Sequence, residues 1–287
     1  MNIQCRDEPL ALITGLTFTS VPCWYDRSRQ DLKMDLIVPK ERAGHAPLPC
    51  LVWVCGGAFM VMDRSVWLPE LMPFARAGYV VASVDYRVSS KAQFPAQLTD
   101  VKASIRYLRA HADALCIDPD RIFIAGESAG GTLACLAGVT SGLPGYDEGD
   151  YLEHSSAVQS VVDFYGITNI YRGACAAVDG IPAWVLDAFI GGGFTSKDAA
   201  AASAVHFVSP AAPPTMILHG TADPLIPVSQ SEKLYELLQK NGVKSDLLLL
   251  EGALHGDDVF YQDEIVDRII YFLGRISYNM EEKPWSA

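Results

Sequence analysis

Residues 122–139 read IFIAGESAGGTLACLAGV, and this stretch is the most informative part of the sequence. A short apolar run at 122–125 ends in Gly126-Glu127-Ser128-Ala129-Gly130, and an alanine- and leucine-rich segment typical of a helix follows. A serine in a tight turn between a strand and a helix is exposed at the end of a sheet, where a histidine can remove its proton. The stretch therefore predicts a nucleophile elbow centred on Ser128.

The length and composition of the chain favour a single globular α/β domain over residues 1–287. A chain of 287 residues buries about 75% of the surface that its unfolded form would expose, so the core is ample. No stretch approaches the roughly 18 consecutive apolar residues that are needed to cross a bilayer. The first residues lack the basic and then apolar pattern of a secretory signal, so we expect a cytoplasmic protein.

The charge and the cysteine pattern argue against several classes of ligand. A net charge of −12 disfavours binding to nucleic acid or to anionic membranes, since both need a basic surface. Seven scattered cysteines, none in C-x-x-C spacing, are typical of reduced thiols in a cytosolic protein. With no H-E-x-x-H motif and six dispersed histidines, we expect no metal site.

The rest of the chain alternates short apolar runs with helical patterns. Strands are expected at 12–19, 31–38, 51–54, 79–84, 122–125, 160–165, 215–218 and 245–250, and helices at 67–77, 95–110, after Ser128, at 230–241 and around 265–273. The first two runs read as an edge hairpin. The later alternation of strand and helix is typical of a parallel sheet built from right-handed βαβ units.

Residues 167–210 interrupt this alternation. The segment holds a glycine triplet at 191–193, an alanine run at 199–202, and the bulky Trp184 and Phe189. Connections of this length inside a compact domain are usually lids or binding loops, so we expect a small helical cap insertion. Trp184 and Phe189, together with Phe59, are candidate substrate contacts, with ordinary core packing as an equally weighted alternative. Residues 277–287 are expected to form an exposed tail.

An activated serine needs a histidine base that a carboxylate orients, and on this kind of sheet they follow in the order serine, acid, histidine. Asp223 follows the strand at 215–218, and His255 follows the strand at 245–250. Asp223 could instead simply begin a turn, but chain order and strand-end placement favour catalysis. We therefore predict a catalytic triad of Ser128, Asp223 and His255. His219 is interpreted as a packing or hydrogen-bonding residue, and residues 257–258 as the start of the final helix.

Backbone N–H donors for a negatively charged oxygen are expected from two places. One is the residue after the nucleophile, Ala129, and the other is a glycine-rich loop after an earlier strand. The run Cys55-Gly56-Gly57-Ala58-Phe59 directly follows the strand at 51–54. We therefore predict an oxyanion hole formed by Gly56, Gly57 and Ala129, with Ala58 as an alternative donor.

Three further segments carry a family resemblance. They are Ser83-Val84-Asp85-Tyr86-Arg87, the run from Phe94 to Val101, and Asp118-Pro119-Asp120-Arg121-Ile122, which leads into the elbow. Together these motifs resemble the α/β-hydrolase serine esterases over roughly residues 10 to 275, above all the hormone-sensitive-lipase-like and the feruloyl- and acetyl-xylan-esterase-like branch. The resemblance implies an α/β-hydrolase fold with a mostly parallel eight-stranded sheet flanked by helices. It also implies a serine esterase without cofactor that acts on small esters, often acetyl or aromatic esters of sugars.

The chain departs from that branch at two positions. Members usually carry histidine where Cys55 stands, and that histidine steadies the oxyanion loop, so here the loop must do without its hydrogen bonds. Many members of the sugar-esterase branch also carry histidine at the position of Thr132. The second departure weakens the transfer of a sugar-ester preference to this chain.

The expected activity is hydrolysis of small short-acyl esters, most of all acetyl esters, including those of carbohydrates. We favour short acyl groups because the chain lacks a large separate lid with an extensive apolar face. An arylformamidase-type amidohydrolase would use the same triad on a different bond. A prolyl-oligopeptidase-type peptidase is disfavoured because no propeller domain precedes the elbow, and a non-catalytic binding module would need a broken triad. The sequence indicates a small-molecule ester as the partner and leaves the oligomeric state open.

Overall fold

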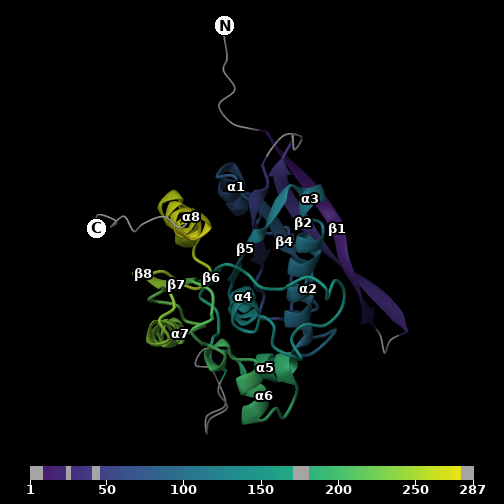
Figure 1. Cartoon of the computed structure of the whole chain (residues 1–287). Helices are drawn as coiled ribbons and strands as arrows, with labels where there is room; N and C mark the ends of the chain where they lie inside the picture. Colours follow the sequence, from purple (N-terminus) through teal and green to yellow (C-terminus); the bar gives the residue numbers. More distant parts are fainter. Residues whose placement is uncertain (1–8, 24–26, 41–45, 171–180, 279–287) are drawn as a thin grey trace.

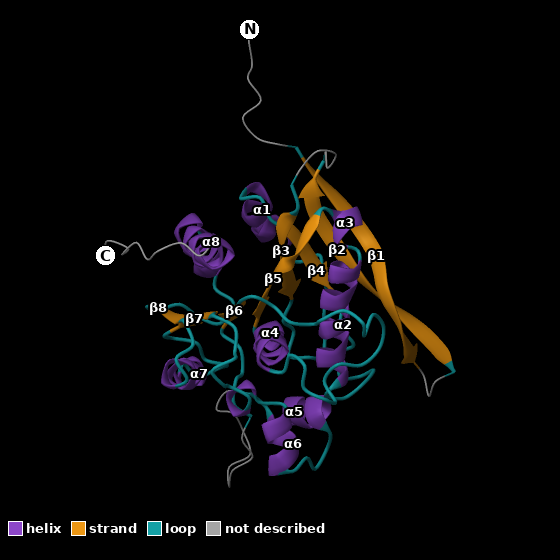
Figure 2. Cartoon of the chain, in the orientation of Figure 1, coloured by secondary structure: helices purple, strands orange, loops and turns teal. Residues whose placement is uncertain are grey.

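The computed structural model consists of one sheet with helices on both faces (Figures 1 and 2), and it describes residues 9–23, 27–40, 46–170 and 181–278. The sheet has eight strands in the order β1-β2-β4-β3-β5-β6-β7-β8. Strands β1 (Leu10–Cys23) and β2 (Ser28–Pro39) form the expected antiparallel edge hairpin, and the strand pairs from β4 to β8 are all parallel. The mostly parallel eight-stranded sheet is confirmed.

The other elements lie close to the ranges expected from the sequence. The strands are β3 (Leu48–Val54), β4 (Val80–Val84), β5 (Ile117–Glu127), β6 (Val161–Phe164), β7 (Thr215–Gly220) and β8 (Ser245–Leu250). The α-helices are α1 (Leu68–Arg76), α2 (Ala96–Ala110), α3 (Ala112–Leu115), α4 (Ala129–Val139), α5 (Ala183–Ile190), α6 (Ser196–Ala201), α7 (Ser229–Lys240) and α8 (Asp263–Tyr278). The short 3₁₀ helices are η1 (Ala204–His206) and η2 (Asp258–Tyr261).

The start of the final helix differs from the expectation. Asp257 caps η2, where its side chain accepts a hydrogen bond from the Val259 N–H, and α8 begins only at Asp263. The prediction of 257–258 as the start of the final helix was therefore wrong. An aspartate favours the beginning of any helical turn, so the residue type alone does not distinguish a short 3₁₀ helix from a long α-helix.

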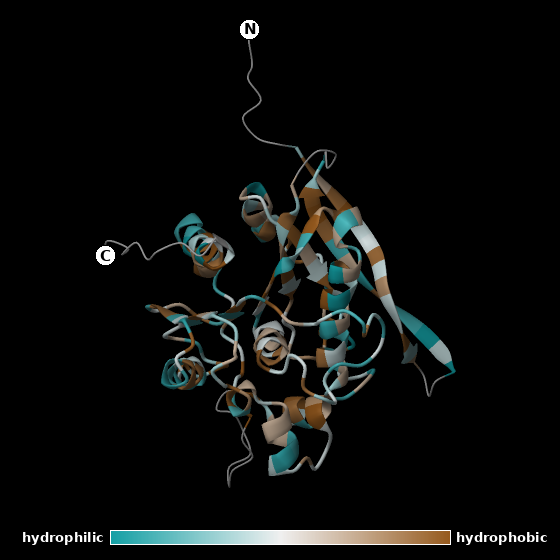
Figure 3. Cartoon of the chain, viewed as in Figure 1, coloured by the Kyte–Doolittle hydropathy of each residue, from teal (hydrophilic) through white to brown (hydrophobic). Residues whose placement is uncertain are grey.

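Alternating residues of the central strands face two separate apolar layers. Val52 and Val54 of β3 pack in the same cluster as α2, α4 and α7, whereas Leu51 and Trp53 pack in the cluster that contains α1 and α8. Figure 1 shows these two groups of helices on opposite faces of the sheet, and Figure 3 shows the hydrophobic strands between them. Successive side chains of a strand point to opposite faces, so a strand that is covered on both sides reads as a continuous apolar run.

The first turn of α4 lies against the end of β3. A Cβ atom on Gly130 would come within 1.9 Å of the Val54 carbonyl oxygen, and one on Gly126 within 2.4 Å of the Gly130 carbonyl oxygen. Only glycine permits so close an approach of two backbones. Ser128, between these glycines, has φ 55° and ψ −119°, a conformation that costs a non-glycine residue on the order of 1–3 kcal/mol.

The segment predicted as a helical cap contains α5, α6 and η1, while its residues 171–180 lie outside the described part of the chain. Helix α5 packs next to the loop that follows β3. The Phe189 ring stacks on Phe59, and the Phe94 N–H donates to the Phe189 carbonyl oxygen at 2.7 Å. At the C-terminus α8 continues to Tyr278, so the predicted tail does not begin at 277, and residues 279–287 lie outside the described residues.

Asp163 of β6 is a fully buried carboxyl group beside the elbow. Its Oδ1 accepts a hydrogen bond from the Gly166 N–H at 3.0 Å, and a Cβ atom on Gly131 would lie 2.4 Å from the same oxygen. Burial raises the pKa of Asp163 to about 6, although His219, the Gly166 N–H and the Cys135 thiol act to lower it. Close packing of α4 on β6 therefore leaves a buried carboxyl group whose pKa lies well above that of an ordinary aspartate.

Replacing Asp163 with asparagine should flatten the pH dependence of stability between about pH 4 and pH 6. A carboxyl group with a raised pKa holds a proton in the folded state that the unfolded chain has already lost, so the free energy of unfolding falls as pH rises through this window. A shift from 3.8 to about 6 corresponds to about 3 kcal/mol. Urea unfolding at pH 4 and pH 7 should show this loss in the wild type and much less of it in Asp163→Asn. An identical pH dependence in both proteins would contradict the raised pKa.

Candidate active site

Ser128 lies between β5 and α4, where the chain leaves the carboxyl end of the sheet. Its N–H donates to the Phe164 carbonyl oxygen at 2.9 Å, and its own carbonyl oxygen accepts from the Thr132 N–H at 3.0 Å. One bond ties the strained turn to the neighbouring strand β6, and the other ties it to the helix that follows. The hydroxyl group is therefore presented from a fixed backbone.

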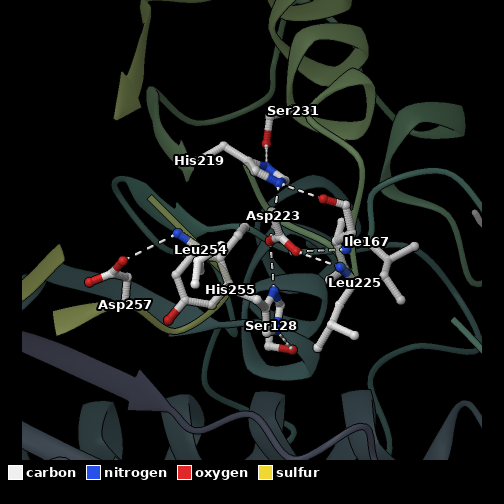
Figure 4. A network of polar contacts seen from close by, with 12 residues as sticks. Ser128, Ile167, His219, Asp223, Leu225, Ser231, Leu254, His255 and Asp257 are labelled. Carbon is white, nitrogen blue, oxygen red and sulfur yellow. Dashed lines mark hydrogen bonds and ion pairs between the residues drawn. The ribbon is translucent and has the colours of Figure 1, made fainter. Parts of the chain in front are cut away.

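His255 joins Ser128 to Asp223 (Figure 4). Its Nε2 lies 2.9 Å from Ser128 Oγ, and its Nδ1 lies 2.7 Å from Asp223 Oδ2. The Tyr165 ring packs against the imidazole with ring centroids 4.7 Å apart. With Nδ1–H donating to the carboxylate, Nε2 is left to accept the hydroxyl proton. The structure thus brings together the three residues that the sequence predicted on three separate loops.

The Asp223 carboxylate is almost fully buried and accepts several hydrogen bonds. Its Oδ1 accepts from the backbone N–H groups of Leu225 at 2.8 Å and Ile226 at 2.9 Å. Burial alone would raise the pKa of Asp223, but hydrogen bonds from His219, His255 and these two amides outweigh burial and hold the pKa well below its usual range. Asp223 therefore remains ionised at neutral and mildly acidic pH, as a partner for a charged imidazole must.

His219, on β7, is a second imidazole beside the same carboxylate (Figure 4). Its Nε2 lies 2.8 Å from the Ile226 carbonyl oxygen and 3.4 Å from Asp223 Oδ2, and its Nδ1 lies 2.7 Å from Ser231 Oγ. When Ser231 donates to Nδ1, the ring proton sits on Nε2 and faces both oxygens. The hydrogen-bonding residue expected from the sequence thus supports the loop that carries Asp223.

The loop after β3 supports the predicted oxyanion hole only in part. The Gly56 N–H donates to Glu127 Oε1, and an N–H that is bonded to this carboxyl group is not available to an oxyanion. The assignment of Gly56 is therefore corrected. Within the described ranges, the N–H groups of Gly57, Ala58 and Ala129 have no protein acceptor. These three groups remain candidates for the donors.

The same loop is strained but firmly held. Gly57, Ala58 and Phe59 have φ of 120°, 54° and 61° in succession. Such conformations persist only where the surroundings impose them. The Gly57 carbonyl oxygen accepts from the N–H groups of Met60 and Val61 at 2.9 Å and 3.1 Å. The Phe59 carbonyl oxygen accepts at 2.8 Å from the N–H of Ser89, in the loop after β4. Several backbone hydrogen bonds therefore maintain a loop conformation that is unfavourable by itself.

Cys55 takes no visible part in the chemistry of the site. Burial, with the nearby Glu127 charge, raises the pKa of its thiol to about 12, so the thiol stays protonated. The backbone of Cys55 is nevertheless anchored, because its carbonyl oxygen accepts from the Tyr86 hydroxyl at 2.9 Å. The loop is thus supported by Tyr86 and Glu127, whereas the resemblance implied support from a histidine at position 55.

Two of the three predicted substrate contacts are buried packing residues. Phe59 and Phe189 are 1% and 0% exposed, and their rings stack with centroids 3.8 Å apart and 9° between planes. No surface of either ring is left for a substrate, so their assignment is corrected to core packing between α5 and the β3 loop. Trp184 on α5 is 60% exposed, and its contact with substrate remains a prediction.

The sequence analysis missed the surroundings of Glu127. Its Oε1 also accepts from Trp67 Nε1–H at 3.1 Å, the Trp67 ring stacks on Tyr261 at 4.5 Å, and the Tyr261 and Tyr165 hydroxyl groups lie 3.4 Å apart. Burial raises the pKa of Glu127, while the Gly56 and Trp67 donors and His255 act to lower it. The sequence signal for Glu127 was an acidic residue at the variable position directly before the serine. No local pattern relates Trp67 or Tyr261 to it.

Other binding features are sparse in the described ranges. There, no group of three or more His, Cys, Asp or Glu side chains is placed to hold a metal ion. Among the described cysteines, those at 23, 50, 55 and 135 are free thiols. No helix in the same ranges has the length and apolar character that a membrane crossing requires.

Comparison with known proteins finds similarity to curated esterases. Esterase LipC of Mycobacterium tuberculosis is 33% identical over 220 residues, which are 74% of this chain and 54% of that protein. A probable isoprenylcysteine alpha-carbonyl methylesterase, ICMEL1 of Oryza sativa subsp. japonica, is 28% identical over 250 residues, 81% of this chain and 56% of that protein. The chain spans about half the length of these curated relatives.

Solved structures give the same fold over nearly the whole chain. A truncated form of a carbohydrate esterase from gut microbiota superposes with a TM-score of 0.81 at 27% identity, covering 95% of this chain and 98% of that one. An esterase of Thermogutta terrifontis, Est2 with propionate bound, shares the fold with a TM-score of 0.75 at 24% identity, over 95% of this chain and 96% of that one. The α/β-hydrolase fold is confirmed.

The decisive comparison is with a family model. The BD-FAE model matches residues 34–238, more than two thirds of the chain, from the second strand through the elbow to the helix after Asp223. The chain therefore belongs to the BD-FAE family and has the α/β-hydrolase fold.

Proposed function

We propose that this protein is a serine carboxylesterase that hydrolyses small esters with short acyl groups, above all acetyl esters. One observation carries the proposal: the continuous hydrogen-bonded chain of 2.9 Å from Ser128 to His255 and 2.7 Å from His255 to Asp223. Acyl transfer needs a buried, ionised acid, a histidine with its proton on the nitrogen that faces this acid, and a nucleophile on a strained turn. Asp223, His255 and Ser128 meet these three requirements. The same two hydrogen bonds argue against a non-catalytic binding module.

In the proposed mechanism His255 removes the proton of Ser128 while Oγ attacks the ester carbonyl carbon. Asp223 keeps the imidazole in place and stabilises its protonated form, because the carboxylate stays ionised. The protonated imidazole then donates to the departing alcohol, and an acyl group remains on Ser128. Water repeats the sequence, with His255 as the base, and releases the carboxylic acid.

The negative charge that develops on the carbonyl oxygen needs N–H donors. We assign them to Ala129 and Gly57, with Ala58 as an alternative, since the Gly56 N–H is bonded to Glu127. Donors that are already oriented stabilise the tetrahedral intermediate without reorganisation at the moment of reaction. The strained backbone from 57 to 59 is the structural cost of that orientation.

Two observations support a short acyl group and a neutral substrate. The stacked rings of Phe59 and Phe189 fill the space between α5 and the β3 loop, so an acyl chain cannot extend there. Leu225 and Leu254, next to the acid and the base, are 47% and 52% exposed and make the surroundings of the site apolar. Related proteins include a carbohydrate esterase and a probable methylesterase, whose names imply different alcohols. The alcohol half of the substrate ester is therefore to be identified by experiment.

Replacing Ser128 with alanine should abolish ester hydrolysis. The variant keeps the fold but has no nucleophile, so we expect kcat for p-nitrophenyl acetate to fall by at least about 10³-fold. The measurement is initial rate at pH 7.5 for both proteins, with thermal unfolding as the control for folding. Hydrolysis that persists in a folded Ser128→Ala variant would refute the proposed nucleophile.

The acyl and bond preference should be measured with p-nitrophenyl esters from acetate to octanoate, followed by acetylated sugars and N-formylkynurenine. We expect kcat/KM to be highest for acetate and to fall with chain length. Turnover of N-formylkynurenine without turnover of esters would replace the esterase proposal with an arylformamidase. Equal rates from acetate to octanoate would contradict the short acyl site.

Replacing Asp223 with asparagine should lower kcat by about 10³- to 10⁴-fold and leave KM nearly unchanged. The asparagine side chain has the same size as aspartate, but it is neutral. It therefore neither stabilises the charged His255 imidazole nor favours the His255 tautomer with the proton on Nδ1. Asp257, which caps η2 in the loop after His255, offers a matched control, because Asp257→Asn also removes one carboxylate from this part of the protein. Equal loss in both variants would show that Asp223 has no special role.

A further inference from the structure

Glu127 is a buried carboxyl group in the site to which the proposed mechanism gives no task. The residue is 8% exposed, and its Oε1 accepts both the Gly56 N–H and the Trp67 Nε1–H. A Cβ atom on Gly56 would lie 2.5 Å from each carboxyl oxygen, so the backbone of the β3 loop rests directly on this side chain. A buried carboxyl group this close to a loop backbone needs those donors, because an unpaired one is costly.

We propose that Glu127 is a positioning residue that holds the oxyanion loop in register with the nucleophile. Glu127 immediately precedes Ser128, and its hydrogen-bond partner Gly56 immediately precedes Gly57. One hydrogen bond between residues 71 positions apart therefore links the two halves of the oxyanion hole, the elbow and the loop. This role rests on the proposed esterase function and explains how the loop is supported without a histidine at position 55.

Aromatic side chains extend the same support to the base. Trp67, held by Glu127, stacks on Tyr261 with 23° between ring planes, and the Tyr261 hydroxyl lies 3.4 Å from that of Tyr165. The Tyr165 ring in turn packs against His255. The carboxyl group thus belongs to a packed unit that contacts the loop directly and the imidazole through three rings.

Burial keeps the thiol and the phenols around Glu127 neutral. The titratable groups that face it from the surrounding elements are Cys55, Tyr86, Tyr165, Tyr261 and His255. Burial raises the pKa of the thiol and of all three phenols, so none of these four groups competes as an anion for the Gly56 N–H. Glu127 is therefore the strong acceptor available to that N–H on this side of the loop.

Two substitutions at Glu127 test the role. Glu127→Gln keeps an oxygen that can accept both hydrogen bonds, whereas Glu127→Ala removes the acceptor. We expect Glu127→Ala to lower kcat for p-nitrophenyl acetate about 100-fold with KM within about threefold, because a small displacement of an oxyanion donor acts on the transition state. Glu127→Gln should restore kcat to within about fivefold of the wild type. A folded Glu127→Ala variant with wild-type kcat would overturn the proposal, and so would a Gln variant as impaired as the Ala variant.

The matched control is Glu70→Gln on α1, one turn from Trp67, which removes a carboxylate near the same aromatic residues without touching the loop. It should keep wild-type kcat, and a loss equal to that of Glu127→Ala would overturn the proposal. If Glu127→Ala does not fold, Glu127→Met provides the comparison, since methionine fills a similar volume without a strong acceptor. Circular dichroism and thermal unfolding establish that each variant is folded.

The rate of labelling of Ser128 by a fluorophosphonate separates this inference from the proposed function. In that reaction Oγ attacks phosphorus, fluoride leaves, His255 takes the proton, and the phosphoryl oxygen occupies the oxyanion hole. A wild-type protein that neither hydrolyses esters nor becomes labelled would refute the esterase function. A labelled wild type with an equally fast Glu127→Ala variant would refute only the positioning role, and a rate lower by about 100-fold would support it.

Discussion

The first turn of α4 packs against the end of β3 more closely than any side chain would allow, and the geometry of the candidate site follows from that contact. Gly130 touches the Val54 carbonyl oxygen, which forces the chain at Ser128 into a conformation that non-glycine residues avoid. Because the oxyanion loop begins directly after Val54, the same contact places this loop beside the serine. The backbone contact between α4 and β3 is therefore enough to bring the nucleophile and the oxyanion donors together, without any side-chain interaction.

Three buried carboxyl groups around the elbow differ in charge because their hydrogen bonds differ. Asp223 accepts from two imidazoles and two amides, and its pKa lies far below the usual range. Glu127 accepts from one amide and one indole, and Asp163 from one amide and one thiol, and burial raises the pKa of both. The number and strength of donors around each group therefore decide which carboxyl stabilises a cation, which supports a loop and which has a pKa well above that of an ordinary aspartate.

In the loop after β3, other residues provide the support that the family resemblance assigned to a histidine at position 55. A histidine at position 55 would support the loop through its side chain, but here Tyr86 holds the Cys55 carbonyl oxygen and Glu127 holds the Gly56 N–H. On the other side, Phe59 inserts under α5 and stacks on Phe189. Three parts of the protein therefore hold this strained loop in place: the loop after β4, which carries Tyr86, the elbow, and the cap segment.

The order of strands and helices along the chain, the elbow, and the loops that carry Asp223 and His255 could be predicted from the sequence alone. These are properties of periodicity, glycine spacing and chain order, each readable along one dimension. Three features emerged only from the folded structure: the Gly56 N–H donates to Glu127, Phe59 and Phe189 stack on each other in the core, and Trp67 and Tyr261 lie beside the Glu127 carboxyl group. The direction of a loop N–H and the burial of a ring depend on residues 60 or more positions away, whose approach no local pattern encodes.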